Sequence, residues 1–178
     1  MKFRSHLALG RALADRSPRL RKHPLRRGCF VLGNVLPDFL FFTYLRGFRH
    51  SRAMIGHSLP YSEKLIRRRL LRRLRLGIRS APDAFRLGLL LHYLADSFTY
   101  PHTEDFSGDR TEHNRYEERL AEVFPAFLTE IPNVPPMSDP GLLRDARASY
   151  DDAPHTPEDD AHWIVFVCSA VFLAVESV

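Results

Sequence analysis

Two pairs of residues near the middle of the chain combine a histidine with an acid four positions later. The first pair is His92 and Asp96, and the second is His113 and Glu117. Residues four apart lie on one face of an α-helix, so each pair can direct two ligands at the same metal ion. His102 stands between the pairs, and imidazole together with carboxylate favours zinc or a similar first-row ion. These five residues therefore predict a metal cluster.

Among these five residues, Asp96 gives the strongest indication of a metal site. It follows the apolar run 89–94, which predicts that its carboxylate is buried, and a buried carboxylate needs a partner. Gly88 lies one turn before His92 on the same helix face, and we expect it to leave room beside the ligands. The alternative is that each histidine is an ordinary core or surface residue. The presence of two His–acid pairs on either side of a third histidine argues against this alternative.

The segment 92–96 (His-Tyr-Leu-Ala-Asp), with 101–102 (Pro-His) and the later His113 and Glu117, resembles the zinc-dependent phospholipase C family. That family shares its fold with the S1/P1 nucleases. The resemblance is to short bacterial members without a signal peptide, and it covers residues 1–124. It implies an all-helical fold and a cluster of up to three zinc ions that cleaves phosphate diesters.

The resemblance also implies ligands upstream of the five residues. They are an early histidine, His6, an aspartate after the segment 33–37, Asp38, and a later histidine. His57 and His50 are both candidates for the last position, and Gly56 directly before His57 favours His57. The implied ion sites are Asp38, His57, His92 and Asp96 for one zinc, His102, His113 and Glu117 for a second, and His6, Asp96 and the amino group of Met1 for a third.

Three hypotheses of function follow. The first is a phosphodiester hydrolase of the phospholipase C type, in which zinc activates water and stabilises the phosphate. The resemblance implies that Asp38 orients or deprotonates that water. The second is a single-strand nuclease or nucleotidase of the S1/P1 type. The third is a metal-stabilised module that binds a membrane or a partner without turnover. The large ligand set favours an enzyme, because a structural zinc site needs only four ligands.

Helical periodicity dominates the chain, and no alternating run predicts a strand. We therefore predict an all-α protein, a compact multi-helix bundle in which residues 1–178 form a single domain. Proline is expected to break the segment 17–27 and to interrupt the apolar run 30–36 at Pro37. The expected helices are 5–15 with Ser5 as a possible cap, 39–45, 62–79, 82–96, 109–124 with a capping box of Asp109 and Glu112, 141–150 and 157–177.

The net charge of +5 conceals an uneven distribution along the chain. Residues 1–80 hold 20 Lys and Arg against three Asp and Glu, whereas residues 81–178 hold six against 18. The basic helix 62–79 suits an anionic membrane surface, and less readily nucleic acid. A solvated arginine face, or mutual neutralisation of the two halves, is an equal alternative.

The cysteine content and the length of the apolar runs bear on the cellular compartment. The presence of only two cysteines argues against a disulfide framework and is compatible with a reducing compartment. The apolar run 163–175 is shorter than the ~20 residues that span a bilayer. We therefore expect a cytoplasmic protein, either free or peripheral at the membrane. Its oligomeric state is left open.

Overall fold

The computed structural model describes residues 1–39, 59–137, 139 and 141–178, and over these residues it contains helices and no strand. The all-α prediction is confirmed. The elements are α1 (Phe3–Arg16), α2 (Pro18–Arg21), α3 (Pro24–Phe39), α5 (Leu59–Leu76), α6 (Ala81–Ser97), the 3₁₀ turn η2 (Tyr100–His102), α7 (Arg110–Phe127), the 3₁₀ turn η3 (Leu128–Asn133), α8 (Gly141–Asp151) and α9 (Pro157–Glu176).

Side-chain caps define where three of these helices begin. The Ser80 hydroxyl accepts a hydrogen bond from the Asp83 amide at the start of α6. Asp109 and Glu112 form the predicted capping box of α7, and Thr156 with Asp159 forms a second one at α9. Each cap satisfies backbone N–H groups that have no partner within the helix. The capping box of α7 is therefore correctly predicted from sequence.

In the N-terminal third of the chain, the prolines do not interrupt helices as expected from the sequence. Pro18 and Pro24 do not break the chain into irregular segments but begin α2 and α3, because a fixed φ suits the first helical turn. Pro37 lies inside α3, which continues to Phe39 instead of stopping. Ser5 is not a cap either, since α1 already begins at Phe3 and Ser5 is buried within it.

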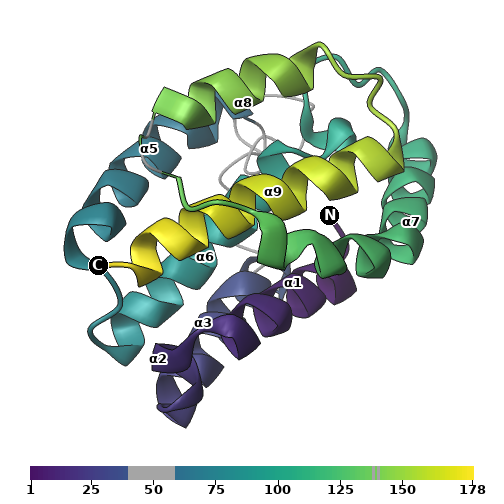
Figure 1. Ribbon diagram of the computed structural model, residues 1–178. Coiled ribbons are helices and arrows are strands. Elements are labelled where there is room, and N and C mark those ends of the chain that lie inside the picture. The colour runs from purple at the N-terminus through teal and green to yellow at the C-terminus, as the bar shows by residue number, and fades with distance from the viewer. Residues whose placement is uncertain (40–58, 138, 140) are drawn as a thin grey trace.

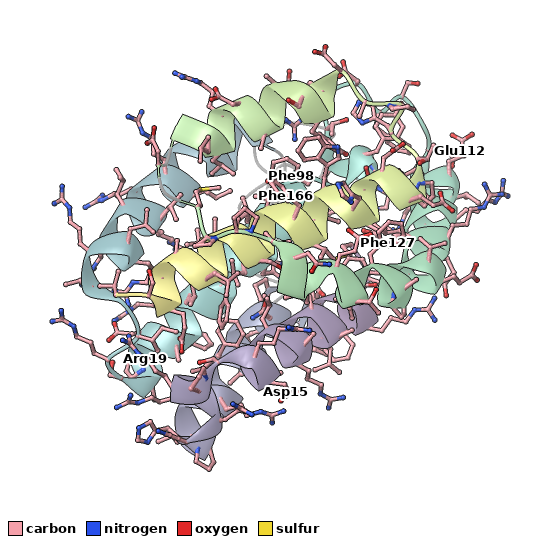
Figure 2. The ribbon with its side chains drawn as sticks, in the orientation of Figure 1. Asp15, Arg19, Phe98, Glu112, Phe127 and Phe166 are labelled. Carbon is pink, nitrogen blue, oxygen red and sulfur yellow. The ribbon has the colours of Figure 1, made fainter. Side chains whose placement is uncertain are left out.

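Helix α6 lies at the centre of the bundle and contacts α1, α3, α5, α9 and η2. Figure 1 shows α9 crossing one face, with α7 at one end of the bundle and α5 at the other. The expected apolar segment 163–175 forms the buried part of α9. Charged side chains such as Asp15 and Glu112 point outward from the bundle (Figure 2). None of the described helices is both long and apolar enough to cross a membrane.

Helices α3 and α6 approach each other closely at two glycines. A Cβ atom built on Gly88 would lie 2.2 Å from the Phe30 carbonyl oxygen, and one on Gly33 would lie 2.2 Å from the Phe85 carbonyl oxygen. Both obstacles are backbone atoms, which cannot move aside without separating the helices. The space beside Gly88 is therefore filled by α3 and not by ligands, which corrects the expectation from the sequence.

Candidate metal centre

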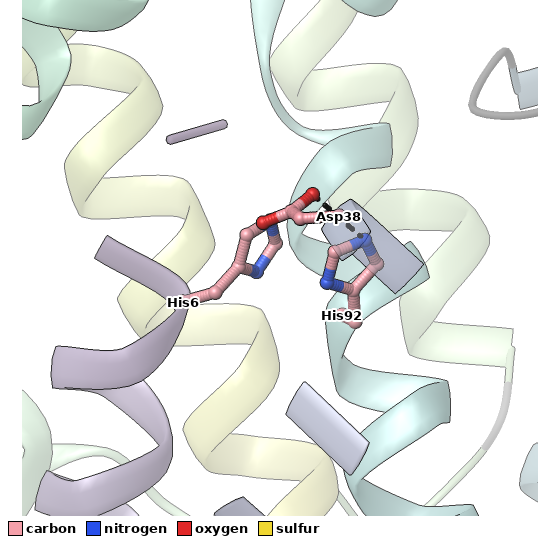
Figure 3. Close-up of side chains that lie close together, drawn as sticks. All are labelled: His6, Asp38 and His92. Carbon is pink, nitrogen blue, oxygen red and sulfur yellow. Dashed lines mark ion pairs between the residues drawn. The ribbon is translucent and has the colours of Figure 1, made fainter. Parts of the chain in front are cut away.

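The first group of potential ligands is built from three helices. His6 comes from α1, Asp38 from the end of α3 and His92 from α6, and their ligand atoms lie within 4.8 Å of one another. Figure 3 shows the three side chains converging, with His92 Nε2 3.7 Å from Asp38 Oδ1. The rings of His6 and His92 stack with their centroids 3.9 Å apart. This group joins positions that are far apart in the sequence.

A backbone contact orients the ring of His92. Its Nδ1–H donates a hydrogen bond of 2.7 Å to the carbonyl oxygen of Asn34 on α3. A carbonyl can only accept, so Nδ1 carries a proton and Nε2 is the nitrogen that faces Asp38 and Asp96. Metal-ligating histidines are commonly held by such a contact on their second nitrogen. Sequence reasoning missed this role of Asn34, because a backbone acceptor has no residue-type signature.

The second group comes from η2 and α7. His102 ends η2, and His113 and Glu117 share one face of α7, as the four-residue spacing predicts. Glu117 Oε1 lies 3.0 Å from His102 Nε2 and 3.3 Å from His113 Nε2. All three are largely shielded from solvent. Two imidazoles and one carboxylate therefore face a common point here.

Asp96 lies between the two groups and contacts both. Its Oδ1 is 3.1 Å from His6 Nε2, and its Oδ2 is 3.3 Å from His92 Nε2. His102 Nδ1 of the second group lies 3.9 Å from Asp96 Oδ1. The carboxylate is 1% exposed, as its apolar sequence context predicts. Asp96 is thus the residue through which the two groups become one cluster.

The amino group of Met1 is also inside this cluster. It lies 3.0 Å from Asp96 Oδ1 and 2.7 Å from Glu117 Oε1, so it contacts a carboxylate at each group. Burial acts to lower the pKa of this amine, but Asp96 and Glu117 together raise it to about 10. A positive charge therefore stands between the two carboxylates.

The protonation states suit cation binding. Burial, reinforced by neighbouring positive groups, lowers the pKa of His6 to about 3 and that of His102 to about 4. Burial acts to raise the pKa of Asp96 and Glu117, but the Met1 ammonium and the nearby histidines hold both well below their usual range. At neutral pH His6 and His102 are thus neutral and Asp96 and Glu117 are ionised, which are the forms that bind metal.

The donor set fits the zinc that the resemblance implies. All the side-chain donors are imidazole nitrogens or carboxylate oxygens, which are ordinary zinc ligands. His6 Nδ1 is buried and has no hydrogen-bond partner among the described residues. Of the predicted ligands, the structure brings together Met1, His6, Asp38, His92, Asp96, His102, His113 and Glu117. His57 and its alternative His50 lie at 40–58, outside the described residues.

Comparison with known proteins gives one finding. The family model described as zinc dependent phospholipase C matches residues 5–164, which is most of the chain. The match therefore reaches beyond the segment 1–124 in which the motif residues were recognised, and it includes all of α8 and the first turns of α9. No match is found among curated proteins or among solved structures.

Proposed function

This chain belongs to the zinc-dependent phospholipase C family, and we propose that it hydrolyses phosphate diesters of phospholipids at the cluster around Asp96. The observation that supports this most is the position of Asp96, which contacts His6 and His92 on one side and His102 on the other. Zinc ions bound at both groups would neutralise phosphate oxygens and lower the pKa of a water. We propose that His6, Asp38 and His92, with His57, hold one side, and His102, His113 and Glu117 the other.

Asp38 is the residue that we propose to act on the attacking water. Its side chain is 16% exposed, whereas those of His6 and His92 are fully buried, so it is the most accessible member of the first group. A carboxylate at the accessible edge can accept the proton of a water molecule or orient it toward the phosphorus. The buried histidines would hold the cation and keep their positions during the reaction.

Metal content and substrate preference test this function together. We expect two to three zinc ions per chain, because the ligands form two groups joined by Asp96. We also expect faster hydrolysis of phosphatidylcholine or anionic phospholipid than of single-stranded DNA. One ion or none would contradict the cluster. Faster cleavage of DNA would favour the nuclease alternative, and stoichiometric zinc without turnover on any substrate would favour the binding module.

The outer face of α5 supports a further part of the proposal, contact with an anionic membrane. The exposed side chains of Arg67, Arg68, Arg72 and Arg75 line a groove together with Leu71, which is 38% exposed. Cations around an apolar side chain suit lipid headgroups. The substrate panel also examines this surface, because the rate on vesicles should rise with their fraction of anionic lipid and fall with added salt.

One arginine of the same helix has a structural role instead. Arg73, which belongs to the same arginine-rich segment, is 2% exposed and forms a 2.7 Å ion pair with Asp83 of α6. It fixes α5 to α6 and is unavailable to a partner. The proposed membrane surface therefore consists of the arginines on the outer side of α5 only.

We propose that the Met1 amine becomes a ligand when a bound cation displaces its proton, so blocking this amine is expected to remove one metal ion and to lower the hydrolytic rate by about tenfold or more. Adding Gly-Ser before Met1 converts the basic amine into an amide nitrogen. The two added residues must also displace Met1 from its buried position, because Met1 is only 4% exposed. The comparison is between protein whose chain starts at Met1 and the extended protein, measured by metal analysis and initial rate. The same dipeptide added after the half-exposed Val178 is the control. Equal metal content and rate in the two N-terminal forms would exclude the amine as a ligand.

A further inference from the structure

A buried carboxylate outside the cluster gathers three hydrogen bonds from three different elements. Asp160, in the first turn of α9, is 0% exposed. Its Oδ2 accepts from the Tyr100 amide at 2.7 Å and from the Tyr116 hydroxyl at 2.9 Å. Its Oδ1 accepts from the Tyr150 hydroxyl at 2.7 Å. Neither group of potential metal ligands includes Asp160.

Two of these three hydrogen bonds come from the segments that carry the second ligand group. Tyr100 is the first residue of η2, which ends at His102. Tyr116 precedes Glu117 on α7. A single oxygen, Asp160 Oδ2, therefore joins the two segments that carry this group, whose members meet at the 3.0 Å contact between His102 and Glu117. The third contact leads to Tyr150 on α8, an element that contributes no ligand to either group.

Burying the Asp160 carboxylate at this position costs free energy. Burial raises the pKa of Asp160 to about 7, although its three hydrogen bonds act in the opposite direction. An apolar residue could fill the same place beside Ile164 and Ala161 in the core without this cost. The hydrogen bonds themselves, and not apolar packing, are therefore what the carboxylate contributes.

We propose that Asp160 is a positioning residue that holds η2 against α7, so that His102 and Glu117 remain at the spacing a shared cation needs. The proposal rests on the function proposed above. Ligands must be held to within about 0.5 Å of their productive geometry, and a short 3₁₀ turn such as η2 cannot do this alone. The first group is carried by α1, α3 and α6, whereas the three hydrogen bonds to Asp160 come from η2, α7 and α8.

A matched pair of tyrosine variants separates positioning from general stability. Tyr116→Phe and Tyr150→Phe each remove one hydroxyl bonded to Asp160, but only Tyr116 belongs to a ligand-bearing helix. We expect Tyr116→Phe to weaken the binding of one metal ion about tenfold. In Tyr150→Phe, the affinity for every bound ion should stay within about threefold of that of the parent protein. The measurement is a titration of the metal-stripped protein with Co²⁺, followed by visible absorption, with thermal unfolding recorded in parallel.

Two variants at the carboxylate complete the test. Asp160→Ala removes every acceptor and should weaken the same ion by about 10- to 100-fold. Asp160→Asn keeps one acceptor oxygen for Tyr100 and Tyr116, while its amide can donate to the Tyr150 oxygen. It should therefore restore most of the affinity. If Asp160→Ala does not fold, the tyrosine pair and Asp160→Asn still decide the question.

Each outcome has a definite meaning. Equal losses in the two tyrosine variants, parental affinities in folded Asp160→Ala, or an Asp160→Asn protein as impaired as Asp160→Ala would each overturn the positioning role while leaving the proposed function intact. A parent protein that binds no metal would overturn both. Weakening of one ion in Tyr116→Phe, with parental affinities in Tyr150→Phe, would support the proposal.

Discussion

Replacing Asp96 with asparagine is expected to lower the hydrolytic rate by a factor on the order of 10³, equivalent to ~4 kcal/mol of transition-state stabilisation. The carboxylate contacts His6 and His92 of the first group and lies 3.9 Å from His102 Nδ1 of the second, so it faces both ligand groups at once. An amide keeps the size of the side chain but has one oxygen and no charge. It cannot serve two cations, and at least one zinc ion should be lost.

The measurements for this variant are metal content per chain and initial rate on the preferred substrate. Asp83→Asn is the matched control, since Asp83 lies on the same helix and pairs with Arg73 instead of the cluster. The control should lose thermal stability but retain its metal and its rate per folded molecule. An Asp96→Asn protein with the parental metal content would show that this carboxylate does not join the two groups.

Replacing Gly88 with alanine is expected to destabilise the protein by about 3 kcal/mol, which lowers the melting temperature by roughly 6–12 °C. The new Cβ would lie 2.2 Å from the Phe30 carbonyl oxygen and 2.9 Å from the Asn34 amide nitrogen. Neither atom can rotate away, so α3 and α6 must separate. The Asn34 carbonyl would then move away from His92, and Asp38 would move with α3, so zinc affinity should fall as well.

Gly28→Ala provides the control for this prediction. Gly28 also lies within a helix, α3, but a Cβ there meets no atom within 4 Å. Alanine should therefore stabilise the protein by about 0.5–1 kcal/mol through helix propensity alone. Thermal unfolding followed by circular dichroism measures both variants. If Gly88→Ala unfolded at the parental temperature, the close approach of α3 and α6 would be disproved.

Local features of the fold were predictable because they depend on residues a few positions apart. The capping box of Asp109 and Glu112 needs a spacing of three, and the pair His113 and Glu117 needs a spacing of four. Both follow from the pitch of the helix. The predictions that failed depend instead on neighbours that are remote in sequence. Pro37 cannot donate a backbone hydrogen bond, but it stays within α3 because packing against α6 stabilises the helix at this point.

Remote contacts account for the roles that were missed or wrongly assigned. Arg73 looks like its exposed neighbours until Asp83 on another helix is placed beside it. Gly88 was expected to make room for ligands, but the backbone of α3 occupies that space. Asp160 stands in an acidic stretch of sequence, and the only signal of its burial was its place one turn before the apolar residue Ile164.

For the candidate metal centre, the sequence by itself determined which residues share a helix face and that Asp96 is buried. These follow from helix geometry and from the apolar run before it. Family resemblance supplied His6, Asp38 and Met1 as candidates, without a physical reason for their meeting. The tertiary structure decided that meeting, because α1, α3 and α6 converge only when their apolar faces are packed and two glycines allow α3 to touch α6. Spacing along the chain determines local geometry, whereas contact between distant segments depends on the packing of the whole core.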